Sequence, residues 1–246
     1  MRIAVCINNV PDTSSKINVE ADNKSISQKG LTFTLNPYDE FAIEEGLRTK
    51  EKSGGEVFVL NVGGESNKET IRKALAMGAD EGLLIKSNQF ELDSLTVAKL
   101  LAEEIKSRNS SIVFTGKQSV DYDNSAVGTM LGELLGFNSV SNVVAFSIDG
   151  ETITAEREVE GGREVVKTTL PAVITCQKGI NEPRYASLKG IMAAKKKVIL
   201  EKEANVPESK IQYLSYKSPK AKSGGQILGA DVTAVPELVK ILKGAR

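Results

Sequence analysis

The first 136 residues alternate short apolar runs with longer segments of helical periodicity. The apolar runs carry few polar side chains, which is typical of strands buried on both faces of a parallel sheet. They cover residues 2–8, 56–62, 82–86 and 111–116. The helical segments are expected at about residues 38–52, 68–77, 93–107 and 124–135. Strands alternating with helices of this length predict βαβ units and an α/β fold with a mostly parallel sheet.

The pattern changes after residue 136. Four strand-like segments follow, at residues 142–148, 152–158, 163–170 and 172–177, with DGE and EGG as tight turns between the first three. These segments predict an antiparallel β-meander that extends the sheet. An irregular loop and a short basic helix are expected over residues 178–198.

Two stretches are polar and weakly periodic. Residues 12–30 are expected to hold a small exposed hairpin. From about Glu201 the chain predicts an extended C-terminal arm, so we divide it into an α/β domain at 1–200 and an arm at 201–246. The lysine-rich run 217–222 is interpreted as a solvated linker.

Composition narrows the function classes. Lys and Arg together number 32, and so do Asp and Glu, which argues against a general nucleic-acid binder. The chain has no His, so His-based triads, general bases and metal sites are excluded. Its two cysteines, Cys6 and Cys176, lie in apolar runs and are expected to be buried and reduced, as in a cytoplasmic protein. No segment predicts membrane insertion or a signal peptide. A binding or carrier role gains weight.

The segment GKQSVDYDNSAVG, residues 116–128, is the leading candidate site. A buried strand ends at Gly116, and a polar loop leads into a helix that Asn124 or Ser125 can cap. The N–H groups at such a helix start can bind an anion, and Ser125, Ala126 and Gly128 are small enough to allow close approach. A ligand site and a plain capped turn both fit this pattern. The segment is not a P-loop, because GxxxxGK[ST] occurs nowhere.

Three further segments each have a functional and a plain interpretation. NPYDEFAIEEG, residues 36–46, has ordinary helix-start chemistry, but it lies where α/β sheets bind ligands. In that helix Glu44 and Glu45 are expected outside the apolar stripe. EREVEGGREVV is expected to be a solvated turn between two strands, and NEPRYASLKGIMAAKKK is either a protein interface or a surface connection.

Together these segments resemble the beta subunit of electron transfer flavoprotein. The matching blocks are NPYDEFAIEEGLRTKE, ETIRKALAMGAD, GKQSVDYDNSAVG, EREVEGGREVVKTTLPAVIT and NEPRYASLKGIMAAKKK. They occur in the family's order, and the resemblance runs from residue 1 to about 200. The last of these blocks is highly specific.

The resemblance implies a Rossmann-like fold related to adenine-nucleotide hydrolases and a non-enzymatic electron carrier subunit. It implies a heterodimer with an alpha subunit that holds most of the FAD, while the beta subunit binds a structural AMP. Electrons would arrive from acyl-CoA-type dehydrogenases, as in fatty acid oxidation, and leave towards a membrane quinone oxidoreductase. The missing His fits this role, because the cofactor carries the electron chemistry.

The resemblance also implies the site residues. Those expected at AMP are Cys6, Asn36, Pro37, Tyr38, Asp39, Val62, Gly116, Gln118, Val120, Asp121, Asp123, Asn124, Ser125, Ala126 and Val127. Glu158 would lie near FAD, and Arg184, Tyr185 and Leu188 would bind partner proteins.

The sequence departs from the family pattern in three places. Residues 124–127 supply fewer hydroxyl and amide side chains than is usual, so phosphate contacts would fall mainly to backbone N–H groups. Thr13 stands where many relatives have an aromatic residue beside the flavin. Tyr122 stands where a flavin-bifurcating branch, with a second FAD in place of AMP, usually has Gly, and this favours AMP.

Two other function classes are open to the same fold. A nucleotide-cleaving enzyme would need a glycine-containing phosphate loop after the first strand, and NNVPDTSSK has none. A stand-alone adenine-nucleotide-binding protein would need neither the RYASL loop nor a long C-terminal arm.

Overall fold

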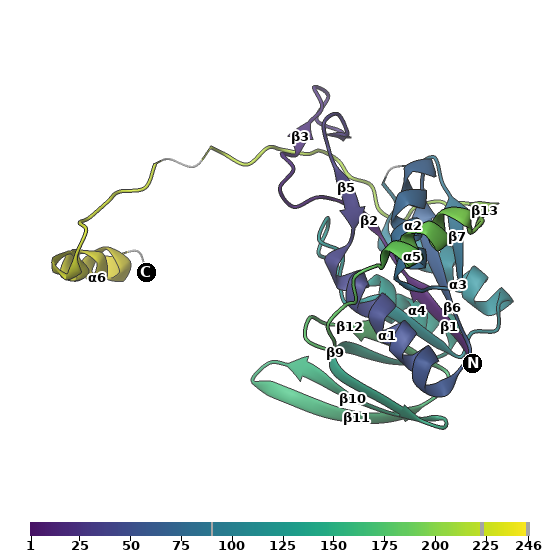
Figure 1. Ribbon diagram of the computed structural model, residues 1–246. Helices are drawn as coiled ribbons and strands as arrows, with labels where there is room; N and C mark the ends of the chain where they lie inside the picture. The colour runs from purple at the N-terminus through teal and green to yellow at the C-terminus, as the bar shows by residue number, and fades with distance from the viewer. Residues whose placement is uncertain (90, 222–223, 245–246) are drawn as a thin grey trace. The chain divides into compact units, whose positions relative to one another are not determined.

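The computed structural model describes residues 1–89, 91–221 and 224–244. Its centre is a nine-stranded sheet in the order β11-β10-β9-β12-β8-β1-β6-β7-β13 (Figure 1). The seven strands from β9 to β13 in that order run parallel, and β10 pairs antiparallel with both β9 and β11. Their bounds are β1 Arg2–Cys6, β6 Glu56–Gly63, β7 Glu81–Lys86, β8 Ile112–Gly116, β9 Asn138–Asp149, β10 Thr152–Val159, β11 Gly162–Thr169, β12 Ala172–Cys176 and β13 Ile199–Glu203. The predicted Rossmann-like α/β class is confirmed.

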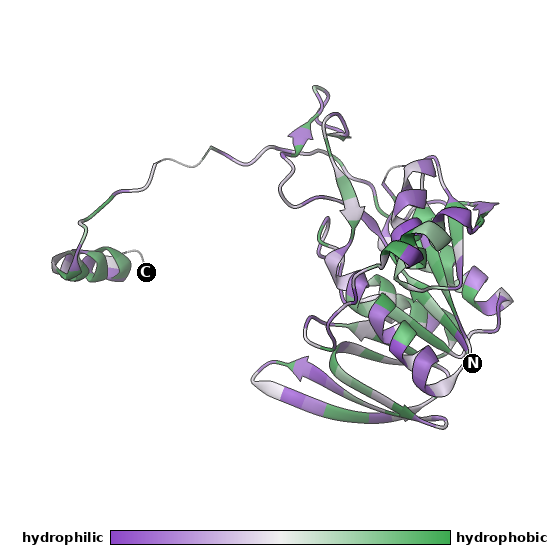
Figure 2. Cartoon of the chain, in the orientation of Figure 1, coloured by the Kyte–Doolittle hydropathy of each residue, from purple (hydrophilic) through white to green (hydrophobic). Residues whose placement is uncertain are grey.

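Helices cover both faces of this sheet. One buried apolar cluster joins it to α1, α2 and α5, and a second joins it to α3 and α4. Alternate residues of β1 serve the two clusters, with Ile3 and Val5 in the first and Ala4 and Cys6 in the second. The bounds are α1 Pro37–Ser53, α2 Lys68–Met77, α3 Ser94–Ser107, α4 Val127–Leu135 and α5 Leu188–Lys196, with a 3₁₀ turn, η1, at Glu65–Asn67. Figure 2 shows the apolar centre between the polar outer faces of the helices.

Strand β12 departs from the predicted meander. Segments β9, β10 and β11 form it, but β12 is inserted between β8 and β9 and runs parallel to both. All five of its residues are buried, so it belongs where helices cover both faces, whereas β11 is mostly exposed at the edge. The unbroken apolar run AVITC is the signal, since meander strands with one wet face alternate.

Strand β13 lies in the segment where the sequence suggested an arm. It pairs in parallel with β7 over Ile199–Glu203, so the sheet continues past residue 200. Ion pairs help to hold this edge, among them Lys202 with Glu104 of α3. Its apolar content is too low for sequence periodicity to distinguish it from a polar arm.

The chain divides into two compact units. The first comprises residues 1–17 and 28–213, and it includes the short antiparallel pair β2 (Asn9–Pro11) and β5 (Phe33–Leu35). The second comprises residues 18–27 and the described part of 214–246. It contains the expected hairpin, formed by β3 (Asn18–Val19) and β4 (Ile26–Ser27), the 3₁₀ turn η2 (Val232–Ala234) and helix α6 (Val235–Gly244). No helix in the described part of the chain is both long and apolar enough to cross a membrane.

Candidate functional site

The carboxyl ends of three central strands converge at one edge of the sheet. Cys6 of β1 pairs with Leu60 of β6 on one side and with Thr115 of β8 on the other. The loop 117–126 follows β8, and α1 begins beside it. Open α/β sheets bind ligands outside the carboxyl ends of their strands, so this edge is the candidate site.

Asn36 joins the start of α1 to that loop. It occupies the N-cap position, but its side chain makes no cap hydrogen bond. Its Nδ2 instead donates to the carbonyl of Gln118 at 2.9 Å, and its Oδ1 accepts the N–H of Val120 at 3.3 Å. Asn36 is buried, so its side-chain amide needs hydrogen-bond partners within the protein, and these two backbone groups of the loop provide them. Asn36 therefore sets the position of the loop rather than capping the helix.

Asp39 joins three elements at the same edge. Its Oδ2 accepts the N–H of Asn8, which follows β1, at 2.7 Å, and its Oδ1 accepts the N–H of Gly116, which ends β8, at 3.0 Å. A Cβ on Gly116 would lie 2.4 Å from Asp39 Oδ1 and 2.8 Å from Tyr38 Cβ, so only glycine fits here. Burial raises the pKa of Asp39 from its ordinary 3.8 to about 7, against these hydrogen bonds.

The titration of Asp39 gives a testable pH dependence. Its pKa is higher in the folded state, so its contribution to stability is present below pH 3.8 and is lost as the pH rises through about 7. Between pH 5 and 8 we expect the unfolding free energy of the wild type to fall by roughly 2–3 kcal/mol relative to Asp39→Asn. Urea unfolding at several pH values measures this, and the fixed cost of the substitution cancels. Parallel pH profiles would contradict a neutral-range titration of Asp39.

The loop is held by its own polar side chains and by left-handed backbone. Gln118 Nε2 donates to Asp123 Oδ1 at 2.6 Å, and Asn8 Nδ2 donates to Ser119 Oγ at 2.8 Å. Asp123 and Ser125 have φ values of 53° and 51°. Residues 121–125 are exposed, and the ring of Tyr122 lies beside that of Tyr213, with centroids 6.0 Å apart. The bulk of Tyr122 thus contacts the chain's own later segment.

The predicted capping of the next helix is wrong. Helix α4 begins at Val127 with Ala126 as N-cap, and that residue provides no side-chain hydrogen bond. Asn124 Nδ2 instead donates to Ser94 Oγ at 3.3 Å, and Ser125 Oγ donates to Gln118 Oε1 at 3.2 Å. The two left-handed residues delay the helix start beyond the expected position. The first N–H groups of α4 have no intrahelical acceptor and no cap from Ala126, which suits an anion.

A chain of amides stabilises the same edge, and the sequence analysis missed it. Asn61 Nδ2 donates to Ile7 O and Asn67 Nδ2 to Asn61 Oδ1, both at 2.8 Å. Asn9 Nδ2 donates to Asn67 Oδ1 at 3.2 Å, and Thr70 Oγ1 donates to Asn9 Oδ1 at 2.7 Å. These bonds link the residue after β1 to β2, β6, η1 and α2. The only indication of it in the sequence is Asn61, a polar residue within the otherwise apolar run of β6.

The remaining expected nucleotide residues fall at the same edge. Val62, at the end of β6, is half-buried, whereas Pro37 in the first turn of α1 is exposed. Cys6 and Cys176 are both free and buried, as expected, and burial raises the pKa of each thiol well above its usual range. Neither thiol is ionised at neutral pH, so Cys6 can offer a ligand only its backbone.

Glu158 is exposed near the end of β10. Its Oε2 accepts Gln177 Nε2 at 3.1 Å, which ties β10 to the residue that follows β12. Gln177 follows Cys176, the register partner of Gly116, so Glu158 is linked to the carboxyl edge of the parallel strands.

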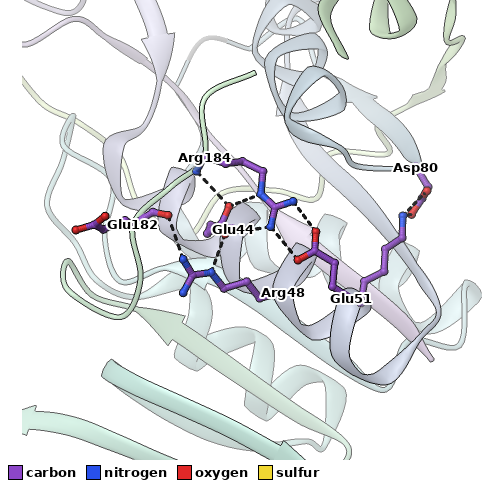
Figure 3. A network of polar contacts seen from close by, with 7 residues as sticks. Glu44, Arg48, Glu51, Asp80, Glu182 and Arg184 are labelled. Carbon is purple, nitrogen blue, oxygen red and sulfur yellow. Dashed lines mark hydrogen bonds and ion pairs between the residues drawn. The ribbon is translucent and has the colours of Figure 1, made fainter. Parts of the chain in front are cut away.

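The loop before α5 lies on α1 through a polar network (Figure 3). Arg184 pairs with Glu44 at 2.7 Å and with Glu51 at 2.6 Å. The expectation that Glu44 and Glu45 would lie on the outer side of α1 is wrong. Both are buried because residues 181–184 lie over them. Beyond this network Tyr185 is 98% exposed and Leu188 is 82% exposed.

These features define a Rossmann-like α/β protein with a candidate ligand-binding edge and an exposed apolar loop. Among the described residues, no group of three or more His, Cys, Asp or Glu side chains is arranged to hold a metal ion. The chain also has no His that could act as a general base at this edge.

Comparison with known proteins identifies the family. The model of the electron transfer flavoprotein domain matches residues 25–207. The chain is 40% identical to electron transfer flavoprotein subunit beta of Syntrophomonas wolfei over 226 residues, which cover 92% of this chain and 88% of that protein. It is 36% identical to the subunit beta of Bacillus subtilis and 35% identical to that of Homo sapiens, with 99% of this chain covered in both cases and 98% and 97% of those proteins. The chain belongs to the electron transfer flavoprotein beta-subunit family.

Proposed function

We propose that this chain is the beta subunit of a heterodimeric electron transfer flavoprotein and acts as an electron carrier subunit, not an enzyme. Electrons pass from acyl-CoA-type flavin dehydrogenases, through FAD held mainly by the alpha subunit, to a membrane quinone oxidoreductase. The FAD supplies the electron chemistry when bound. The observation that carries the proposal is the full-length match to subunits of this name in bacteria and in animals. We place the carrier in the cytoplasm. Of the arm expected at residues 201–246, the part beyond β13 is proposed to pack on the alpha subunit, because residues 201–203 pair with β7 in the chain's own sheet.

The nucleotide edge is proposed to hold a structural AMP. Its residues fit a phosphate, because α4 begins without a side-chain cap and the small side chain of Ala126 at the N-cap leaves room beside the first N–H groups. Gly128, which the sequence suggested for the same purpose, instead allows α4 to pack closely on the sheet, since a Cβ there would lie 2.4 Å from Cγ2 of Thr175 and 2.8 Å from Oγ1 of Thr115. Asn36 and Asp39 fix the loop and strand ends around that position. The other proposed contacts are Cys6, Pro37, Tyr38, Val62, Gly116, Gln118, Val120, Asp121, Asp123, Asn124, Ser125 and Val127. A ligand bound only to the native state also stabilises it by mass action.

A flavin-bifurcating relative with FAD in place of AMP is the second candidate. The observation against it is Tyr122, whose ring lies beside that of Tyr213. The bulk of these two neighbouring rings leaves less room beside the loop for a dinucleotide than a glycine at position 122 would. Tyr122→Gly would give the loop the glycine that the bifurcating branch usually has at this position.

Glu158 is proposed to lie near the flavin and to orient a cationic side chain of the alpha subunit. Removing its charge in Glu158→Gln should leave the heterodimer intact and destabilise the reduced, anionic flavin. We expect the midpoint potential to fall by about 30 mV, which for two electrons corresponds to about 1.4 kcal/mol. Redox titration of the heterodimer measures the shift. Glu151→Gln, an exposed turn residue on the same hairpin, is the control. Equal potentials in both variants would make Glu158 a plain surface charge.

Co-expression with the alpha subunit tests the proposed function. The isolated chain should be colourless, and the two chains together should yield a yellow 1:1 complex. A tightly bound flavin on the isolated chain would overturn the carrier-subunit proposal.

A further inference from the structure

We propose that Glu44 is a positioning residue: it fixes residues 181–187 against α1 and so presents Tyr185 and Leu188 to the electron-donating dehydrogenase. The inference rests on the proposed carrier function and on the partner-binding role that the family resemblance implies for Arg184, Tyr185 and Leu188. It assigns Arg184 an internal role in place of a contact with the partner protein.

The Glu44 carboxylate receives four hydrogen bonds. Its Oε2 accepts the backbone N–H of Arg184 at 3.2 Å and the Nε of the same residue at 2.7 Å. Its Oε1 accepts Nη2 of Arg184 at 3.1 Å and Nε of Arg48 at 2.7 Å. One buried carboxylate therefore holds both the main chain and the side chain of a single loop residue (Figure 3). A contact of this kind fixes backbone position as well as charge.

Five further hydrogen bonds attach the same loop to α1. Asn181 Nδ2 donates to Phe41 O at 3.0 Å and to Glu45 Oε2 at 2.9 Å. Arg48 Nη2 donates to Glu182 O at 3.4 Å. Arg184 also binds the exposed Glu51, through Nη1 at 2.6 Å and Nη2 at 3.1 Å. The polar attachment thus covers residues 181–184.

The far end of the loop is fixed separately. Ser187 caps α5, since its Oγ accepts the N–H of Gly190 at 3.0 Å. Gly190 packs so closely on α2 that a Cβ would lie 2.4 Å from Ala76 O. Tyr185 lies between the two attachments and Leu188 lies just past the cap, and both stay exposed. A surface held at both ends before binding loses less conformational entropy when a partner docks.

The charge on Glu44 persists at neutral pH. Burial acts to raise its pKa, but hydrogen bonds from Arg184 and Arg48 outweigh it and leave the pKa below its ordinary value. Glu45 beside it has a raised pKa, chiefly because of burial. A buried carboxylate deprived of its arginine is strongly unfavourable, so Glu44 and Arg184 act as a pair.

The test uses the complete heterodimer and three variants. Glu44→Gln removes the buried charge, Arg184→Lys keeps the cation but loses the planar fork, and Glu51→Gln removes only the exposed partner. Hydrogen exchange of the peptide spanning residues 180–187, read by mass spectrometry, measures loop order without any partner. Reduction by a purified medium-chain acyl-CoA dehydrogenase, loaded with its acyl-CoA, gives KM and kcat for the carrier.

We expect Glu44→Gln to speed exchange in this peptide and to raise KM about tenfold with kcat unchanged, as for a loop that holds its docking geometry about a tenth of the time. Arg184→Lys should give a smaller rise, and Glu51→Gln should stay near wild type. If Glu44→Gln does not fold, Arg184→Lys carries the test.

Two results would overturn the inference: unchanged exchange in both pair variants, or faster exchange with an unchanged KM. In the second case Leu188→Ala shows whether the proposed docking role of the loop also fails. If it raises KM, the loop docks without needing Glu44. If it does not, the proposed docking role fails as well.

Discussion

Leu188→Ala is expected to weaken docking to an acyl-CoA-type dehydrogenase by about ten- to a hundredfold. Burying one Leu side chain contributes roughly 1.5–3 kcal/mol, and about 1.4 kcal/mol corresponds to a factor of ten. Leu188 is 82% exposed at the first position of α5, so it has apolar area to bury on a partner. The measurement is the dependence of reduction rate on carrier concentration, with one purified dehydrogenase as donor.

The alternative for Leu188 is packing on Ile191 and Met192 of its own helix. That role would lower the melting temperature and leave electron transfer normal, and this outcome would remove the docking proposal. Leu200→Ala provides a matched control, because Leu200 is 43% exposed on β13 and lies outside the loop. We expect the control to transfer electrons like the wild type.

Asn36→Ala is expected to release AMP. The substitution removes the bond to the Gln118 carbonyl and leaves the N–H of Val120 without its acceptor. Leaving a buried polar group unsatisfied costs about 1–3 kcal/mol, so AMP affinity should fall by about ten- to a hundredfold. Chromatography of nucleotide released from denatured, dialysed protein measures the remaining occupancy.

Asn138→Ala is the matched control for this loss. Asn138 begins β9, and its Nδ2 also donates to a backbone carbonyl, that of Thr169, at 2.9 Å. The control should keep its AMP. Equal occupancy in Asn36→Ala and the control would show that AMP does not depend on the loop that Asn36 holds.

The parallel strands β1, β6, β7 and β8 were predictable because they are short and apolar and are separated by segments of helical periodicity. β12 was misplaced because neighbours in sequence suggested a hairpin, while its position depends on burial of both faces. Strand β13 was missed because its edge position tolerates charged residues such as Glu201 and Lys202. Sequence patterns indicate which residues become buried. They do not indicate which distant strands pair, because that pairing depends on the assembled core.

The candidate site shows the same limit. The position of the polar loop after β8 was predicted, and its residues do gather with the start of α1. The roles of individual polar residues were not. Asn36 and Asp39 looked like helix-start residues, and Glu44 looked solvent-facing. Each is bound to a segment more than 30 residues away, and local periodicity carries no information about such partners.

The nucleotide content of the co-expressed heterodimer tests the account most directly. Denaturation and chromatography should give about one FAD and one AMP per heterodimer, because a single flavin carries the electrons and the loop at residues 116–127 holds a mononucleotide. Two FAD and no AMP would contradict the account and assign the chain to the bifurcating branch.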